Sequence, residues 1–202
     1  MQIKRGERLV LATHNKGKLR EMRDLLAPYG IDLVSAGDLG LPEPVETETT
    51  FIGNASLKAV AAANGSGLPA LSDDSGIEIA ALDGAPGVVS ADWAGPGKDF
   101  SVAMQRVHAE MQACGARFED RPRANFTSVL CLARPGQSAR CFDGKVFGHI
   151  AWPPRGSNGF GYDPIFVPDG FTQTFGEMAA AQKHRLSHRA RSFEKFTAAC
   201  LE

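Results

Sequence analysis

The first 34 residues alternate between strand and helix patterns, and this alternation restricts the fold more than any other feature. Residues 8–13 (RLVLAT) form a short apolar run typical of a buried strand, and residues 16–27 carry Leu and Met at helical spacing. Pro28 and Gly30 end this helix, and residues 31–34 predict a second strand. A strand, a helix and another strand in close succession indicate an α/β fold.

The same alternation continues along the chain. Asp99 is a candidate N-cap for the third helix, and the turn Pro135-Gly136 separates two later strands. The predicted elements are a helix at 51–63 ended by Asn64-Gly65, strands at 69–72 and 77–82 around a turn at 73–76 (DDSG), a helix at 100–111, strands at 123–133, 138–142 and 145–150, and a terminal helix that begins at Ser187 and turns Ala190, Phe193 and Thr197 inward.

Size and charge limit the classes of function. The chain has 202 residues, 43% hydrophobic residues and a net charge of −1, which is compatible with one domain over 1–202, with room for two lobes. Near-neutral charge gives no electrostatic reason to expect nucleic acid or an anionic membrane as a partner. No apolar run reaches the ~18 residues of a membrane span, and the first residues do not resemble a signal peptide.

The cysteines indicate a compartment. Cys114, Cys131, Cys141 and Cys200 form no CxxC pair. In a chain of this length we expect reduced, mostly buried thiols, as in a cytoplasmic protein.

A possible phosphate site lies where the first strand gives way to the first helix. Backbone N–H groups and the positive end of the helix dipole gather at such a position and favour an anion. The same residues are also compatible with an ordinary helix start that carries two exposed lysines, and the Walker A pattern is absent. The segment reads Thr13-His14-Asn15-Lys16-Gly17-Lys18.

Acidic residues in two segments are candidate metal ligands. Asp73 and Asp74 follow an apolar strand, where carboxylates are well placed to hold Mg²⁺. Since neighbouring strand residues point to opposite faces, we expect only one of them to face a given site. The segment is equally compatible with an Asx-type turn. Glu46 lies in an acidic loop that could supply a second ligand or simply favour the start of the next helix; on that helix Lys58 by itself is expected to be exposed.

Two segments in the last quarter of the chain could bind a planar ligand. In the first, an aromatic residue stands between two glycines, which lets a ring lie flat against a ligand while the backbone approaches it. In the second, basic residues gather at a helix start, where acids are more usual. Plain packing and an exposed basic patch remain alternatives. The residues are Gly159, Phe160, Gly161, Tyr162 and Asp163, and then Lys183, His188 and Arg189.

Five segments together resemble one family, the inosine triphosphate pyrophosphatases, also called dITP/XTP diphosphatases. They occur in the order typical of the family, between residue 9 and about residue 195. Five ordered motifs are far more specific than any one of them. The segments are LATHNKGKLREM (11–22), ETTFIGNASLKA (48–59), LSDDSGIEIAALDGAPGVVSA (71–91), SNGFGYDPIF (157–166) and KHRLSHR (183–189).

The resemblance implies a fold, an activity and partners. The fold would be α/β, with a mixed central sheet flanked by helices and two lobes with a cleft between them. The enzyme would be a homodimer that uses Mg²⁺ and cleaves non-standard purine nucleoside triphosphates (ITP, dITP, XTP) to the monophosphate and pyrophosphate. This activity would remove them from the nucleotide pool before their incorporation into DNA or RNA.

The resemblance also implies a role for each matching residue. Asp74 would be the general base and, with Glu46, a Mg²⁺ ligand. The triphosphate would be bound by Thr13, His14, Asn15, Lys16, Gly17, Lys18 and Lys58, with Ser75 as a neighbouring contact. The base and ribose would be bound by Phe160, Gly161, Tyr162, Asp163, Lys183, His188 and Arg189.

The chain departs from the family pattern at three positions. Gly53 stands where the family commonly has Glu, Asp92 where Arg is usual, and Asn158 in the run before Phe160. Gly53 leaves Glu46 as the better metal candidate. Two other functions remain open: a related pyrophosphatase that prefers pyrimidine or modified nucleotides, and a nucleotide-binding regulator without turnover.

Overall fold

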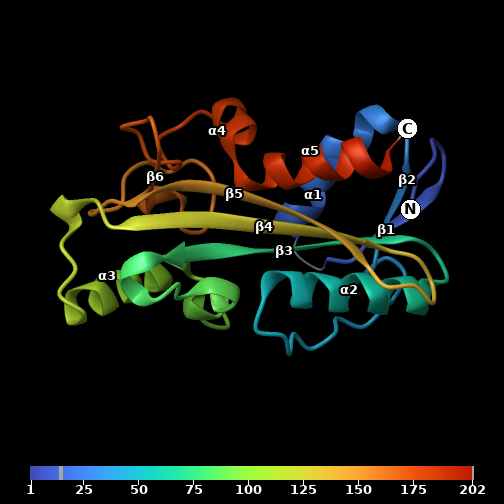
Figure 1. Cartoon of the computed structure of the whole chain (residues 1–202), viewed down its shortest axis with the longest axis horizontal. Helices are drawn as coiled ribbons and strands as arrows, with labels where there is room; N and C mark the ends of the chain where they lie inside the picture. The colour runs from blue at the N-terminus through green and yellow to red at the C-terminus, as the bar shows by residue number, and fades with distance from the viewer. Residues whose placement is uncertain (14–15, 202) are drawn as a thin grey trace. The chain divides into compact units, whose positions relative to one another are not determined.

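Six strands form one sheet in the structure. The computed structural model describes residues 1–13 and 16–201, with the backbone alone for Lys16 and Glu21. The strand order is β2-β1-β3-β4-β5-β6, with the labels of Figure 1. Strand β1 pairs in parallel with β2 and with β3, whereas β5 and β6 pair antiparallel. The sheet is therefore mixed, and the predicted α/β class is confirmed.

The elements follow the predicted alternation of strands and helices. The strands are β1 (Arg8–Leu11), β2 (Asp32–Ser35), β3 (Ala70–Ile79), β4 (Arg123–Ala133), β5 (Arg140–Ile150) and β6 (Phe166–Pro168). The helices are α1 (Lys16–Leu26), α2 (Phe51–Ser66), α3 (Phe100–Ala113), α4 (Ala180–Leu186) and α5 (His188–Cys200). None of the helices in the described part of the chain is long and apolar enough to cross a bilayer.

The chain divides into two compact units that share the long strands β3, β4 and β5. The first unit consists of residues 1–74, 129–143 and 192–202. The second consists of residues 75–128 and 144–191. Each unit has its own apolar core, which fits the prediction of two lobes.

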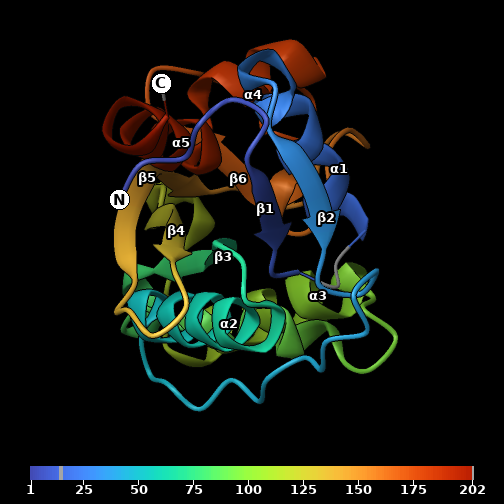
Figure 2. The ribbon, with the colours of Figure 1, turned by 90° about the vertical axis from the view of Figure 1, so that its right-hand side faces the viewer.

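In the first unit, helices cover both faces of the sheet (Figures 1 and 2). Helices α1 and α5 lie on one face and α2 lies on the other. The core beneath α1 and α5 includes Met22, Leu26, Leu71, Leu130, Phe193 and Phe196. Helix α2 begins at its N-cap Thr50, whose side chain accepts a hydrogen bond from Gly53 N, and ends at Gly67, which has a left-handed backbone. The predicted end at Asn64-Gly65 was therefore too early.

The core of the second unit gathers α3, the far ends of the long strands and β6. Asp99 caps α3 as predicted, because its carboxylate accepts a hydrogen bond from Ser101 N. Several aromatic rings fill this core, and Phe126 contacts both Phe166 and Phe175. Its buried residues include Ile77, Ile79, Val107, Met111, Phe126, Ile165, Phe166 and Phe175.

One predicted turn and one predicted break between two strands are wrong, because a single strand runs through each. Residues 73–76 (DDSG) lie inside β3, which is one continuous strand. Residues 138–150 likewise form the single strand β5 from Arg140 onward. In α5 the buried face is carried by Ser192, Phe193 and Phe196 rather than by Ala190 and Thr197, which are half-buried.

The expectation of four reduced thiols is also wrong. Cys131 and Cys141 form a disulfide between the neighbouring strands β4 and β5. The two strands are joined by a short turn, so that residues ten apart in sequence come to face each other, with their Cα atoms 4.1 Å apart. Cys200 is a buried thiol as expected, whereas the Cys114 thiol is exposed.

Candidate active site

Lys58 and Asp74 meet because α2 is hydrogen-bonded to β3 close to both residues. Ser72 Oγ donates to the carbonyl oxygen of Ala55 at 2.6 Å. Lys58 lies three residues after Ala55 on the same side of the helix, and Asp74 lies two residues after Ser72 on the same face of the strand. The helical and strand periods therefore bring the two side chains opposite each other.

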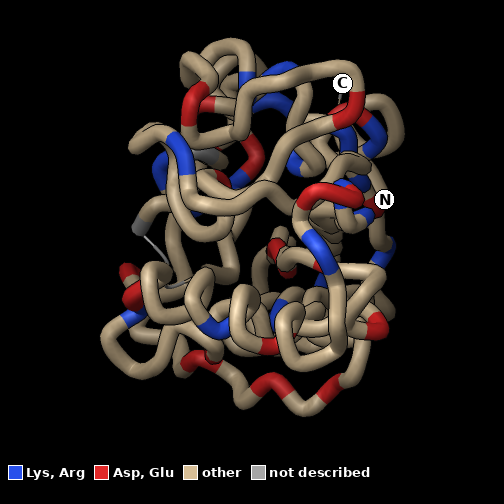
Figure 3. The backbone as a smooth tube through the Cα atoms, turned by 90° about the vertical axis from the view of Figure 1, so that its left-hand side faces the viewer, with Lys and Arg blue, Asp and Glu red and all other residues tan. Residues whose placement is uncertain are grey.

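The Lys58 ammonium lies between two carboxylates. Lys58 Nζ is 3.0 Å from Asp74 Oδ1 and 2.7 Å from Glu46 Oε1. Lys58 and Asp74 are buried, whereas Glu46 comes from the exposed loop before α2. Acidic positions recur along that loop (Figure 3). The expectation that Lys58 is exposed is therefore wrong, because this charge is paired from two sides.

Burial sets the acidity of this cluster. Burial raises the pKa of Asp74 to about 6, although the positive charges of Lys58 and Lys18 act in the opposite direction. Burial alone would lower the pKa of Lys58, but the carboxylates of Asp74 and Glu46 outweigh it and raise this pKa. A carboxyl group whose pKa lies near neutral pH is suited to accept a proton from water.

The same carboxylates fit a divalent cation. Asp74 Oδ2 is buried and has no hydrogen-bond partner in the part of the chain that the structure describes. Asp74 and Glu46 already converge on one positive charge, and carboxylate oxygens are the ligands that Mg²⁺ prefers. No cluster of three or more metal-ligating side chains occurs within residues 1–13 and 16–201. Asp74 and Glu46 are the two side chains that would hold a bound Mg²⁺.

Asp73 points away from this pair and binds a second lysine. Asp73 Oδ2 lies 2.6 Å from Lys18 Nζ, and the Asp73 side chain is only 3% exposed. Lys18 is the last residue of the predicted triphosphate loop and lies in the first turn of α1. Of that loop, Thr13 and Gly17 lie in the described backbone, whereas His14 and Asn15 lie outside the described residues.

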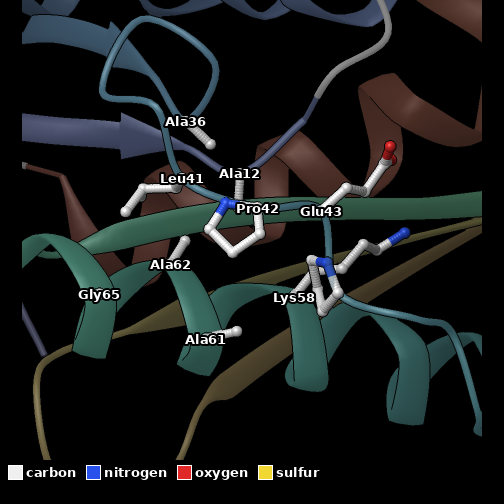
Figure 4. A pocket seen from close by; sticks show the side chains of 10 residues that line it. Ala12, Ala36, Leu41, Pro42, Glu43, Lys58, Ala61, Ala62 and Gly65 are labelled. Atoms are coloured by element: carbon white, nitrogen blue, oxygen red, sulfur yellow. The ribbon is translucent and has the colours of Figure 1, made fainter.

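A cavity of about 150 Å³ adjoins the stem of Lys58 (Figure 4). Its wall is mostly apolar, with Lys58 and Glu43 as its charged members. Small-molecule sites usually measure about 300–1,000 Å³, so this cavity alone does not hold a nucleotide. The lining residues are Ala12, Ala36, Leu41, Pro42, Glu43, Pro44, Lys58, Ala61, Ala62 and Gly65.

In the second unit, Asp163 organises the glycine-rich segment. Its buried carboxylate accepts hydrogen bonds from Phe160 N and from Lys183 Nζ. Burial raises the pKa of Asp163, while the positive charge of Lys183 acts in the opposite direction. Gly159 has φ = +76°, and a Cβ there would lie 2.0 Å from Asp163 Oδ2. The segment can therefore wrap around this carboxylate only with glycine at position 159.

The Phe160 ring is half exposed and lies beside two cations. The ring is 52% exposed. Lys183 Nζ lies 4.7 Å from its centroid, and the Arg189 guanidinium carbon lies 5.8 Å from it. Arg189 Nη2 also donates to Ser75 Oγ at 3.4 Å. An accessible ring beside hydrogen-bond donors is the arrangement that a planar, polar base requires.

Other predicted residues of this unit are less accessible. His188 is buried and stacks on Phe126, with their ring centroids 5.0 Å apart. The Tyr162 side chain is buried, and its hydroxyl donates to the carbonyl oxygen of Ser90. Any contact of Tyr162 with a ligand would therefore come from its backbone. The structure thus brings Lys18, Lys58, Glu46 and Asp74 together in one unit, and Ser75, Phe160, Asp163, Lys183 and Arg189 in the other.

Two ion pairs were not anticipated from the sequence. Reasoning from the residues did not link Lys18 to Asp73, or Lys183 to Asp163. The strand period had already placed Asp73 and Asp74 on opposite faces, but the competing interpretation of DDSG as a turn obscured its meaning. For Lys183 no comparable local signal exists, since its partner lies 20 residues away.

Known proteins resemble the chain over nearly its full length. The model of the Ham1 family matches residues 9–199. A relative from Bradyrhizobium diazoefficiens, named dITP/XTP pyrophosphatase, is 55% identical and is aligned over 96% of each chain. A relative with the same name from Ruegeria pomeroyi is also 55% identical, again over 96% of each chain.

Solved structures share the fold. A HAM1 protein from Coxiella burnetii superposes with a TM-score of 0.89 and 37% identity, over 96% of this chain and 98% of that one. A structure from Mycobacterium abscessus, described as nucleoside-triphosphatase / dITP/XTP pyrophosphatase, gives a TM-score of 0.77 and 36% identity, over 94% and 98% of the two chains.

Proposed function

The chain belongs to the Ham1 family, and on this premise we propose that it hydrolyses ITP, dITP and XTP to the nucleoside monophosphate and pyrophosphate. The observation that carries the proposal is the triad of buried Lys58, buried Asp74 and the exposed loop residue Glu46, in which burial raises the pKa of the Asp74 carboxyl group to about 6. Such a group can act as a base at neutral pH beside a cation that attracts phosphate. Destroying these nucleotides would keep them out of DNA and RNA.

Each part of the triad has a proposed task. Asp74 orients a water molecule and accepts its proton as the water attacks phosphorus. Lys58 and Lys18 offset the charge that develops on the phosphate oxygens, as phosphoryl transfer requires. Mg²⁺, held by Asp74 and Glu46, would supply further positive charge at these oxygens.

The triphosphate and the base have separate sets of proposed ligands. Thr13, His14, Asn15, Lys16 and Gly17 would bind the phosphates together with the two lysines, and Ser75 would be a neighbouring contact. Phe160 would stack on the base, and the backbone of Gly161 and Tyr162 would line its pocket. Hydrogen-bonding groups around the base and ribose would come from Asp163, Lys183, His188 and Arg189.

The choice of base follows from its hydrogen-bonding pattern. Hypoxanthine and xanthine present an acceptor at O6 and a donor at N1, whereas adenine presents the reverse. A donor aimed at O6, such as a backbone N–H or a side-chain donor of His188 or Arg189, would lose this hydrogen bond when adenine is bound. Unpaired buried polar groups can support about 10⁴-fold discrimination.

Further parts of the proposal concern the whole protein. We propose that residues 1–202 act as one catalytic domain and that the enzyme is a homodimer. We also propose that it works in the cytoplasm, where nucleoside triphosphates are used, although the Cys131–Cys141 disulfide removes the support that four reduced thiols would have given. Size-exclusion chromatography with light scattering tests the homodimer directly, because a monomer of this chain has a mass of 21.5 kDa.

The decisive experiment measures the released phosphate species. ITP, dITP, XTP, GTP, ATP and CTP are each incubated with the protein, with and without Mg²⁺. We expect pyrophosphate from ITP, dITP and XTP, little from ATP, and a requirement for Mg²⁺. Orthophosphate would mean cleavage between the β and γ phosphates, a preference for CTP would support the pyrimidine-directed alternative, and tight binding of ITP without any release would support a regulator.

A further inference from the structure

The two adjacent aspartates of β3 serve different faces of the first unit. Asp74 lies on the face covered by α2, where it meets Lys58. Asp73 lies on the face covered by α1, where it meets Lys18 at 2.6 Å. Their strand neighbours behave in the same way, since Leu71 packs in the core under α1 whereas Ser72 bonds to α2.

From this division we propose that Asp73 is a positioning residue that holds the Lys18 ammonium in place for the triphosphate and does not bind the metal. The proposal rests on the function proposed above, and it assigns a role to a carboxylate that is neither the base nor a metal ligand. It excludes the alternative that Asp73 and Asp74 share one Mg²⁺.

Burial makes the Asp73–Lys18 pair a fixed element. The Asp73 side chain is 3% exposed and that of Lys18 is 18% exposed. A carboxylate this far from water requires a charged or hydrogen-bonding partner. Because Lys18 is that partner, its long side chain is ordered before any ligand arrives. The entropic cost of ordering this lysine side chain is therefore already met in the free protein.

The pair leaves the ammonium able to serve a phosphate. An ammonium has three N–H donors, so a bond to Asp73 is compatible with a bond to a phosphate oxygen. Lys18 and Asp73 border a small cavity of about 10 Å³ that Thr13 also lines. The cavity beside Lys58 has a different set of lining residues. Asp73 thus holds Lys18, whereas Asp74 and Glu46 hold Lys58, although the charge of Lys18 also acts on Asp74.

Simple charge neutralisation makes the opposite prediction about anion binding. If Asp73 only cancelled the charge of Lys18, Asp73→Asn would make this region more positive and would tighten the binding of a polyphosphate. If Asp73 positions Lys18, the same substitution weakens the binding, although it removes a negative charge.

The first test is calorimetric binding of inorganic triphosphate at fixed ionic strength, without Mg²⁺. We expect Asp73→Asn to weaken binding about 5- to 20-fold, and to have no further effect in a Lys18→Met background, because both changes remove one interaction. Unchanged or tighter binding in Asp73→Asn overturns the proposal, as does an equal loss in the Lys18→Met background. This readout does not depend on turnover.

The second test uses turnover and Mg²⁺. We expect Asp73→Asn to lower kcat/KM for dITP about 10- to 100-fold, while the Mg²⁺ concentration for half-maximal rate stays within twofold of the wild type. A large increase in that concentration would make Asp73 a metal ligand and overturn the proposal. If the wild type releases no pyrophosphate from any nucleotide, the proposed function fails, and the calorimetric test still decides the role of Asp73.

Glu7→Gln is the matched control. Glu7 pairs with Arg134 at 2.8 Å, is partly buried and lies before β1, whereas Thr13 and Lys18 follow it. The Glu7→Gln substitution should lower the free energy of unfolding without changing the affinity for inorganic triphosphate. If Asp73→Asn does not fold, Asp73→Glu replaces it, because glutamate keeps the charge and shifts the carboxylate by one methylene. We expect Asp73→Glu to weaken triphosphate binding less than Asp73→Asn would. Tighter or unchanged binding would again contradict the proposal.

Discussion

Replacing Asp74 with asparagine should remove activity, and the stability of the variant relative to the wild type should rise with pH. Burial raises the pKa of Asp74 from 3.8 to about 6. The ionised form is therefore disfavoured in the folded state. At about 1.4 kcal/mol for each tenfold change in proton affinity, the difference amounts to about 3 kcal/mol. General-base catalysis contributes about 10²–10⁴-fold, and we expect a loss of that order in kcat.

The sign of the pH dependence follows from the raised pKa. Below pH 3.8 the carboxyl group is protonated in both the folded and the unfolded chain, and the destabilisation is absent. It grows as the pH rises and is complete above about pH 6, where both forms are ionised. Because asparagine is neutral at every pH, the stability of Asp74→Asn relative to the wild type should increase by about 2 kcal/mol between about pH 4.5 and pH 8.

Urea unfolding in the presence of EDTA measures this difference, since a bound metal would itself stabilise the carboxylate. Thermal unfolding is a second measure. For a chain of this size, about 2 kcal/mol should change the difference in melting temperature between Asp74→Asn and the wild type by about 4–8 °C between the two pH values. Asp92→Asn is the control, because Asp92 is exposed and its carboxylate stays in water. If the advantage of Asp74→Asn is the same at both pH values, burial of this carboxyl group does not control its protonation and the reasoning fails.

Three further predictions address other parts of the molecule. Phe160→Ala should raise KM for ITP about 5- to 150-fold through lost base stacking, which steady-state rates measure. Thermal unfolding should show little change in melting temperature, because the Phe160 side chain is half exposed. A denatured, non-reduced chain should show two reactive thiols and a reduced one four, because Cys131 and Cys141 are joined. Gly53→Ala should lower the urea midpoint, because its Cβ would lie 2.6 Å from Glu48 Cβ, and adding Glu48→Gly should restore it.

The local patterns predicted most elements because each pattern has one physical meaning. The strand at 123–133 and the cap at Asp99 appear where apolar runs and capping residues placed them. The predictions failed where polar residues interrupt a strand. DDSG has the composition of a turn, but it lies within β3, which neighbours β4 in the sheet, and no local pattern reports this long-range pairing.

The candidate site was harder to derive than the fold. The resemblance named Glu46, Lys58 and Asp74 but did not say that one ammonium joins both carboxylates. That arrangement depends on the position of a loop, and the loop before α2 has no periodic pattern. Gly53 is easier to explain afterwards: it stands three residues after the N-cap Thr50, where Glu would complete a capping box. The absence of a glutamate at position 53 affects the start of α2 and need not affect the proposed metal site.

The buried lysine could have been recognised from the helical period alone. Phe51, Ala55, Lys58 and Ala62 recur at the spacing of one helix face, and all four are buried. A lysine on the apolar stripe of an alanine-rich helix is costly unless acidic groups meet it. The facing strand supplies a carboxylate at Asp74, so the position of Lys58 within the stripe already implies an ion pair with the sheet. A charged residue on the apolar face of a helix is thus stronger evidence for a functional site than a lysine or an aspartate considered without its position.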